Sequence, residues 1–168
     1  SQTGKAKIGD TEVSIKEIAS VKGGEMILRL EDGSTVNASD VEYGSSAEAL
    51  IYESVTDMNL NSATANAFVK GYEQSEGLSA QEYVLGFREA YRYGEYGFPV
   101  QEMSKDGFSA KLSQTQRSLA YDLGKTDMKY KVAENQSLKE KIASTSAKNA
   151  EKIASTGTKK GKVHYAEG

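Results

Sequence analysis

The chain has 168 residues, a formal net charge of −3, no cysteine, one histidine and a mean hydropathy of −0.58. The length fits one ordinary domain or two small ones. The missing cysteine excludes disulfides, thiolate metal sites and cysteine nucleophiles, and a single histidine excludes any mechanism that needs two.

Residues 1–44 are predicted to form a small antiparallel β domain. Five short runs have β character: KAKI, TEVSI, EIASVK, EMILRL and STVNA. Turns fall at dipeptides that supply the positive φ of tight hairpins, namely Gly9-Asp10, Gly23-Gly24 and Asp32-Gly33. Met26, Leu28 and Leu30 alternate with polar residues and so share one face. We predict an α+β fold that opens with a strongly bent, SH3-like sheet.

The hydrophobic period becomes helical from Ser45, and residues 45–126 are predicted to form a helical domain. Two serine–glutamate pairs have the spacing of a capping box, Ser45 with Glu48 and Ser79 with Glu82. Helices are expected from Ser45, from near Asn61 and from about residue 80.

The third of these helices is expected to stop at Gly94, because glycine accepts the left-handed conformation of a helix C-cap. A fourth helix is predicted over residues 112–124. Its apolar stripe is expected to contain Leu112, Leu119, Ala120 and Leu123.

The C-terminal part has a different composition. EKIAST occurs at residues 140–145 and again at 151–156, an eleven-residue step that places Ile142 and Ile153 nearly in line on a helix. We predict an extended, exposed helix over 127–156 and a linker over 157–168.

Charge is divided between these parts, since residues 1–128 carry 12 basic against 20 acidic side chains and residues 129–162 carry 9 lysines against 3 glutamates. The lysine-rich helix could bind nucleic acid, or its Ile142–Ile153 stripe could pair with another copy. No apolar run approaches the roughly 20 residues of a membrane span, so we expect no membrane partner.

The densest aromatic run is FREAYRYGEYGFPV, residues 87–100. Tyr83, Phe87 and Tyr91 recur every four residues and are expected to fill the core from one helix face. Nucleic-acid stacking is the competing interpretation, but the acidic body disfavours it. The candidate binding surface is the remainder of this run: Arg88, Arg92, Tyr93, Tyr96 and Phe98. We expect the arginines to pair with Glu89 and Glu95, and the rings of Tyr96 and Phe98 to tuck back onto the helix.

Other constellations are weaker. Asp57, Asn59 and Asn61 match the start of a calcium loop, but Ser62 and Phe68 stand where an EF-hand needs glycine and glutamate, so we expect a helix end and a cap. Acids also gather in one stretch: Glu95, Glu102, Asp106, Asp122 and Asp127. A hydrolase using Glu95 or Glu102 would need an apolar pocket around them.

His164 stands in the predicted linker. The chain has no HExxH, GxSxG or phosphate-loop motif, and we expect neither catalytic residues nor a cofactor or metal.

Three segments carry a resemblance: LRLEDGSTVNASDVEY, LNSATANAFVKGYEQSEGLSAQEYVLGFREAYRYGEYG and KKGKVHYAEG. Together they are similar to a stretch inside very large multidomain proteins of phage and integrative conjugative elements of Firmicutes. The resemblance implies an accessory or linker-associated domain of a mobile-element protein. Because no catalytic set is present, we expect a non-catalytic function, in which the domain positions neighbouring modules of a larger protein or binds a partner protein. The chain begins at Ser1 without methionine, and we expect an excerpt of a larger protein, with a processed form as the alternative. The expected compartment is the cytoplasm.

Overall fold

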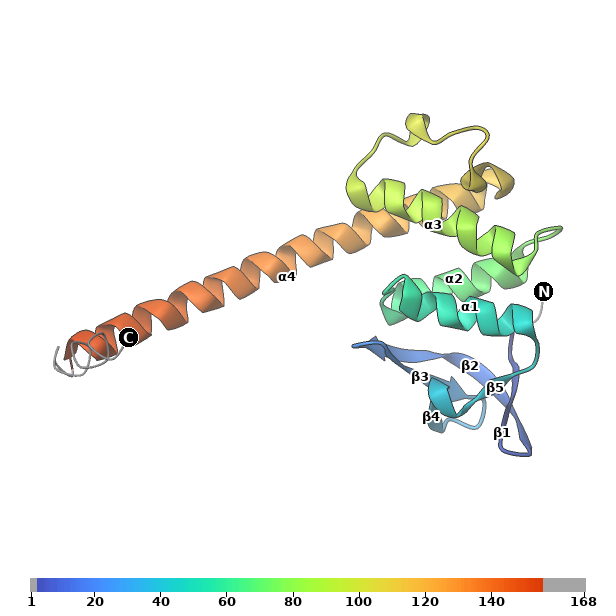
Figure 1. Ribbon diagram of the computed structural model, residues 1–168, viewed down its shortest axis with the longest axis horizontal. Coiled ribbons are helices and arrows are strands. Elements are labelled where there is room, and N and C mark those ends of the chain that lie inside the picture. The colour runs from blue at the N-terminus through green and yellow to red at the C-terminus, as the bar shows by residue number, and fades with distance from the viewer. Residues whose placement is uncertain (1–2, 156–168) are drawn as a thin grey trace, which may run out of the picture. The chain divides into compact units, whose positions relative to one another are not determined.

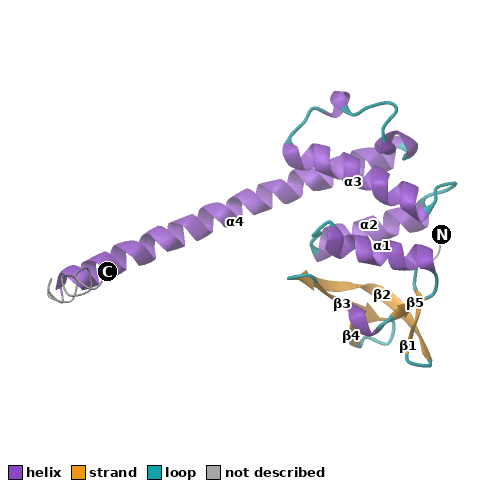
Figure 2. Ribbon diagram, viewed as in Figure 1, coloured by secondary structure: helices purple, strands orange, loops and turns teal. Residues whose placement is uncertain are grey.

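The computed structural model describes residues 3–155, and the chain divides into two units, Ser1–Thr126 and Asp127–Gly168. The first unit combines a five-stranded antiparallel sheet with helices (Figure 2), which confirms the predicted α+β class. The linker predicted over 157–168, together with His164, lies outside the described residues.

The sheet has the strand order β4-β3-β2-β1-β5. Its strands are β1 (Lys5–Ile8), β2 (Thr11–Lys22), β3 (Glu25–Leu30), β4 (Thr35–Asn37) and β5 (Glu42–Tyr43). A short 3-10 helix, η1 (Ala38–Asp40), precedes β5. The alternation in β3 behaves as predicted, since Met26, Leu28 and Leu30 are all buried.

Strand β2 corrects the prediction that TEVSI and EIASVK are separate strands. It is continuous, and its register against β3 shifts between Ile15 and Glu17 and again between Ile18 and Ser20. Each shift adds one unpaired residue, and such bulges bend a strand and increase its twist. The bend lets the first half of β2 pair with β1 and the second half with β3.

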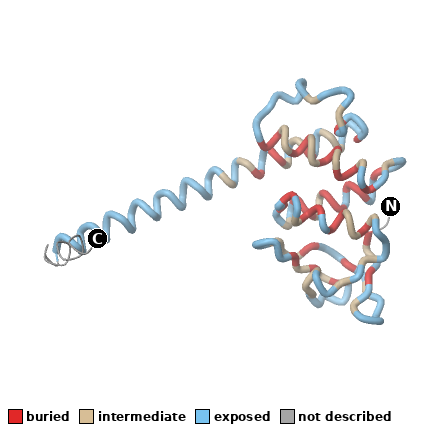
Figure 3. Tube along the Cα trace, in the orientation of Figure 1, coloured by how far each residue is buried: buried red, intermediate tan, exposed pale blue. Residues whose placement is uncertain are grey.

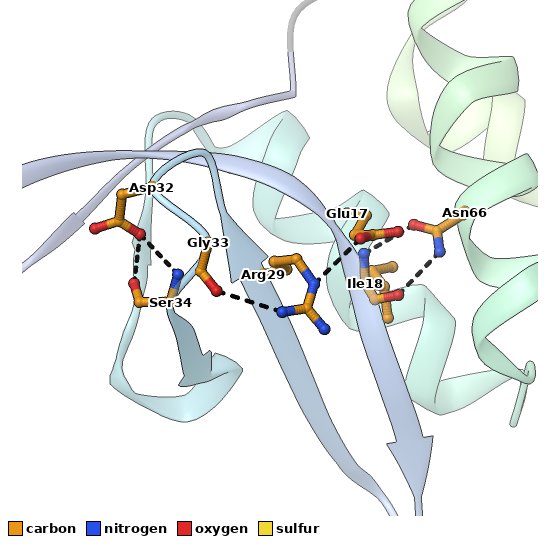
Figure 4. Close-up of polar contacts among 7 residues, drawn as sticks. All are labelled: Glu17, Ile18, Arg29, Asp32, Gly33, Ser34 and Asn66. Atoms are coloured by element: carbon orange, nitrogen blue, oxygen red, sulfur yellow. Dashed lines mark hydrogen bonds and ion pairs between the residues drawn. The ribbon is translucent and has the colours of Figure 1, made fainter.

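An amide side chain joins this bent strand to the helices (Figure 4). Asn66 Oδ1 accepts from the Ile18 N–H at 2.8 Å, and Asn66 Nδ2 donates to the Ile18 carbonyl at 2.9 Å. The amide thus takes the place of a neighbouring strand, because it satisfies both backbone groups of Ile18. On the surface of the same sheet, Arg29 pairs with Glu17 at 3.2 Å.

Three helices follow β5. They are α1 (Ser46–Asp57), α2 (Ser62–Gln74) and α3 (Ala80–Tyr96). Figure 1 shows α1 and α2 between the sheet and α3. Two short 3-10 helices, η2 (Val100–Glu102) and η3 (Phe108–Lys111), interrupt the connection to α4 (Gln114–Ser155).

The predicted aromatic face of α3 is confirmed as core. Tyr83, Phe87 and Tyr91 are at most 2% exposed, and the ring of Phe87 contacts the rings of both Tyr83 and Tyr91. Phe68 of α2 packs edge-on against Phe87 at a centroid distance of 4.8 Å. The Tyr83 hydroxyl donates to the Phe68 carbonyl at 2.6 Å, so its burial leaves no unsatisfied polar group there.

Helix α3 does not stop at Gly94, as the sequence suggested, but continues to Tyr96. Gly97 is the left-handed C-cap, with a φ of 75°. Gly94 is instead a point of close contact between two helices. A Cβ atom built there would lie 1.9 Å from the Tyr121 carbonyl oxygen, so no larger residue fits without a shift of the backbone. Gly124 approaches the Tyr91 carbonyl in the same way, so the two glycines let the backbones of α3 and α4 touch.

The fourth helix also differs from its prediction. Ser113 caps it through a bond from the Gln116 N–H, so Leu112 lies before the helix, buried against Gly86. Leu119 is exposed, because the packed face of the helix is set by the small residues Ala120 and Gly124.

Helix α4 is a single element rather than a short helix followed by a separate extended one. Residues 132–155 of this helix are exposed throughout (Figure 3), as predicted. The prediction of an exposed helix is wrong at its first residue, because Asp127 is only 5% exposed.

The close crossing of α3 and α4 predicts that replacing a helical glycine by alanine destabilises the protein, which is the opposite of the usual effect. Alanine normally favours a helix over glycine by about 1 kcal/mol. We nevertheless expect Gly94→Ala to lower the free energy of unfolding by about 1–3 kcal/mol, because the added methyl group forces the two backbones apart. Urea unfolding followed by circular dichroism measures this.

Gly4→Ala is the matched control, since a Cβ there meets only an ordinary contact at 3.5 Å. A Gly94→Ala variant as stable as the wild type would contradict the close crossing.

Candidate functional site

The two candidate arginines, Arg88 and Arg92, differ in the contacts that their side chains make within the fold. Arg92 Nη1 bonds Glu95 Oε1 at 2.7 Å, and its guanidinium lies 5.7 Å from the centroid of the Tyr91 ring. This confirms the predicted pairing of Arg92 with Glu95. Arg88 is partly exposed on α3.

Glu89 is not the arginine partner that we predicted. Its Oε2 accepts from the Ser109 N–H at 2.6 Å, and the same carboxylate occupies the space beside Gly107. Glu89 therefore anchors the start of η3 to α3.

The end of α3 is a Schellman motif, and this motif positions two of the candidate rings. The Phe98 N–H donates to the Tyr93 carbonyl at 2.9 Å and the Gly97 N–H donates to the Gly94 carbonyl at 3.2 Å. Such motifs bring together the residues at the Tyr93 and Phe98 positions. Their rings meet edge to face at 5.6 Å.

A further bond fixes the backbone of this turn. The Tyr121 hydroxyl donates to the Phe98 carbonyl at 2.6 Å. The backbone of Phe98, which follows the helix end, is therefore fixed by hydrogen bonds on both sides, and this lowers the entropy cost of binding to its ring.

Tyr93, Tyr96 and Phe98 form what we term the aromatic patch. Phe98 contacts both other rings, lying 5.9 Å from that of Tyr96, yet it stays 47% exposed. Tyr96 is 63% exposed, so the prediction that its ring tucks back onto the helix is wrong. The chain turns at Gly97, directly after Tyr96, and leaves the Tyr96 ring in solvent.

The acids proposed for hydrolysis lie in different environments. Glu95 is buried and bound to the Arg92 guanidinium, whereas Glu102 is exposed in η2. Asp106 and Asp122 are exposed as well. A hydrolase of this kind would need two acids in one apolar pocket, whereas Glu102, Asp106 and Asp122 are all exposed to solvent.

The calcium-like spacing at Asp57, Asn59 and Asn61 is a helix junction, as expected. Asp57 ends α1, Asn59 has a left-handed φ of 54°, and Asn61 Oδ1 accepts from the Thr64 N–H to cap α2. Asparagine is the residue that tolerates such a φ best after glycine. Within residues 3–155, no group of three or more acids and histidines is arranged to hold a metal ion.

Sequence reasoning missed one unusual acid, Glu48. It is 6% exposed at the start of α1, and its Oε2 has no hydrogen-bond partner among the described residues. Burial raises the pKa of the Glu48 carboxyl, the Gly44 N–H partly offsets this, and the charge of Glu73 adds to the rise.

The burial of Glu48 was missed because its capping-box spacing from Ser45 already accounted for a glutamate at the start of a helix. Ser45 Oγ accepts from the Glu48 N–H at 3.1 Å, so the serine half of the predicted box forms as expected. At α3 both halves form, between Ser79 and Glu82, and there the Lys111 ammonium holds the pKa of the partly exposed Glu82 carboxyl down at about 2.

Comparisons with protein-family models, with curated proteins and with solved structures find no match to this chain. None of the helices within residues 3–155 is both long and apolar enough to cross a bilayer.

The environment of Glu48 predicts a pH-dependent gain in stability from Glu48→Gln. A raised pKa means that the ionised carboxylate is disfavoured in the fold, and this cost is fully present above the raised value. We expect the variant to unfold at a higher urea concentration than the wild type at pH 8. The difference should shrink as the pH falls to the ordinary glutamate value of 4.5.

Glu53→Gln, an exposed site on the same helix, is the control and should show no such pH trend. Equal stability of Glu48→Gln and wild type at every pH would rule out the buried charge.

Proposed function

We propose that this protein is a non-catalytic protein-interaction module that binds through the aromatic patch. The observation that carries the proposal is the exposure of Tyr96 and Phe98 beside Tyr93, while the neighbouring rings of α3 are buried. Tyrosine and phenylalanine are enriched in protein interfaces, where they supply large contact areas.

The setting of the patch also favours a protein ligand over a phosphate. Arg92, the nearest arginine in sequence, is bound to Glu95 and stacked on Tyr91. Residues 1–128 carry a formal net charge of −8, which repels a polyanion.

The partner that we propose is a neighbouring module of a larger mobile-element protein. The resemblance of the sequence to segments of large phage and conjugative-element proteins supports this. In that setting the first unit would dock adjacent modules, and α4 would act as a spacer.

A paired substitution tests the aromatic patch. We expect Tyr96→Ser combined with Phe98→Ser to weaken binding to the flanking modules of the parent protein by tenfold or more, because anchor rings at an interface typically contribute at least about 1 kcal/mol each. Isothermal titration calorimetry with the separately expressed modules measures the loss.

Phe108→Ser is the matched control, since Phe108 is 52% exposed but lies in η3 outside the patch. Unchanged affinity in the paired variant, or an equal loss in the control, would remove the patch from the interface.

A second candidate function, nucleic-acid binding, rests on one feature of α4. Lys141, Lys148 and Lys152 follow at steps of seven and four residues, which places them on one side of the helix. Such a row can follow a phosphate backbone.

The row of lysines predicts a defined salt dependence if this second function holds. Three phosphate contacts should weaken duplex DNA binding by about 40-fold between 50 and 200 mM salt. Filter binding of the full chain measures this. Replacing Lys141, Lys148 and Lys152 by alanine should remove the dependence. The triple alanine variant of Lys129, Lys131 and Lys139 is the control, and equal effects of both variants would contradict a specific row.

A further inference from the structure

Helix α4 from residue 132 onwards has too little support from its own residues to be stable alone. Every residue of 132–155 is exposed, and long polar helices in water depend on ion pairs at helical spacing or on a partner. At the centre, neither Lys139, Glu140 nor Lys141 has an opposite charge three or four residues away. A partner surface is therefore needed.

One face of the helix carries the apolar residues at regular spacing. Leu138, Ile142 and Ile153 are 56%, 57% and 60% exposed. Three polar residues lie on the same side of the helix, between and before these apolar ones. Neighbouring positions along this side are three or four residues apart, and the pattern of positions repeats after eleven residues. We term the full line the α4 stripe: Asn135, Leu138, Ile142, Ser146, Asn149 and Ile153.

The two asparagines of the stripe restrict what can cover it. Burying Asn135 and Asn149 against an apolar groove would leave their amides unsatisfied, at a cost of a few kcal/mol in total. A second copy of the helix, parallel and in register, offers an amide at the same level as each amide. It also places Ile142 against Ile142. A single buried asparagine pair of this kind is known to fix register in paired helices.

The charges beside the stripe agree with this arrangement. Glu134 lies on one flank and Lys139 on the other, five residues apart, so in a parallel pair Glu134 of each copy reaches Lys139 of the second copy. The two Lys141 side chains, which lie on the Glu134 flank, are then on opposite sides of the contact and do not meet. An antiparallel pair centred on Ile142 would instead bring the two Lys141 side chains together.

We propose that the α4 stripe binds the same stripe of a second copy as a parallel, in-register pair of helices. The aromatic patch plays no part in this contact. The pairing of the helices is therefore independent of the proposed binding function of the aromatic patch, and each can be tested without the other.

The absence of cysteine from the chain makes a thiol cross-linking test direct. Ser146→Cys places a thiol on the stripe, and Ser144→Cys makes the same substitution on the opposite face. In the parallel pair, Ser146→Cys alone should form a disulfide dimer at least about tenfold faster than Ser144→Cys, because association raises the effective thiol concentration. Non-reducing electrophoresis of the full chain in a glutathione redox buffer measures both rates.

Three outcomes would overturn the proposal. Equal rates for the two variants would indicate random collision. Cross-linking only in a mixture of Ser146→Cys with Leu138→Cys would indicate the antiparallel pair. Sedimentation equilibrium of the wild-type chain showing only monomer at rising concentration, or more than two chains, would exclude the two-helix assembly.

Discussion

The first unit depends on the burial of one face of α3. Tyr83, Phe87 and Tyr91 lie one helical turn apart, and Phe68 of α2 closes the cluster from the other side. Rings of this size contribute several kcal/mol each when fully buried. The Tyr83 hydroxyl can be buried only because the Phe68 carbonyl accepts from it and Gly71 leaves room for it.

The same helix determines where the exposed rings lie. Gly94 brings α4 against α3, and Gly97 ends α3 three residues later in a left-handed conformation. Tyr91, before the crossing, is buried, whereas Tyr96, the last residue of the helix, is exposed to solvent. The aromatic patch is thus a consequence of how the core helix ends, and hydrogen bonds to the carbonyls of Tyr93 and Phe98 fix its backbone.

The two units are stabilised by different physical means. In the first, apolar burial and backbone hydrogen bonds supply the stability, and a single amide, Asn66, joins strand β2 to α2. In the second, the described part is one helix whose side chains beyond residue 131 are all exposed. A helix without a buried face relies on local propensity alone, and this contrast is the reason for assigning it a partner.

Much of the local structure followed from the sequence by itself. Turn dipeptides placed the hairpins, alternation identified the buried face of β3, and four-residue spacing identified the core rings of α3, because these patterns depend only on neighbours along the chain. Ser79 with Glu82 and Asn61 capped their helices as their spacing predicted.

Tertiary structure decided the rest. Glycine suits both a helix end and a helix crossing, so only the position of Tyr121 shows that Gly94 is a crossing and Gly97 the cap. The continuity of β2 depends on its pairing with two different strands, and the burial of Glu48 depends on the chain packed around it. The exposure of Tyr96 was decided in the same way, because whether a ring is core or surface depends on contacts between residues far apart in the sequence.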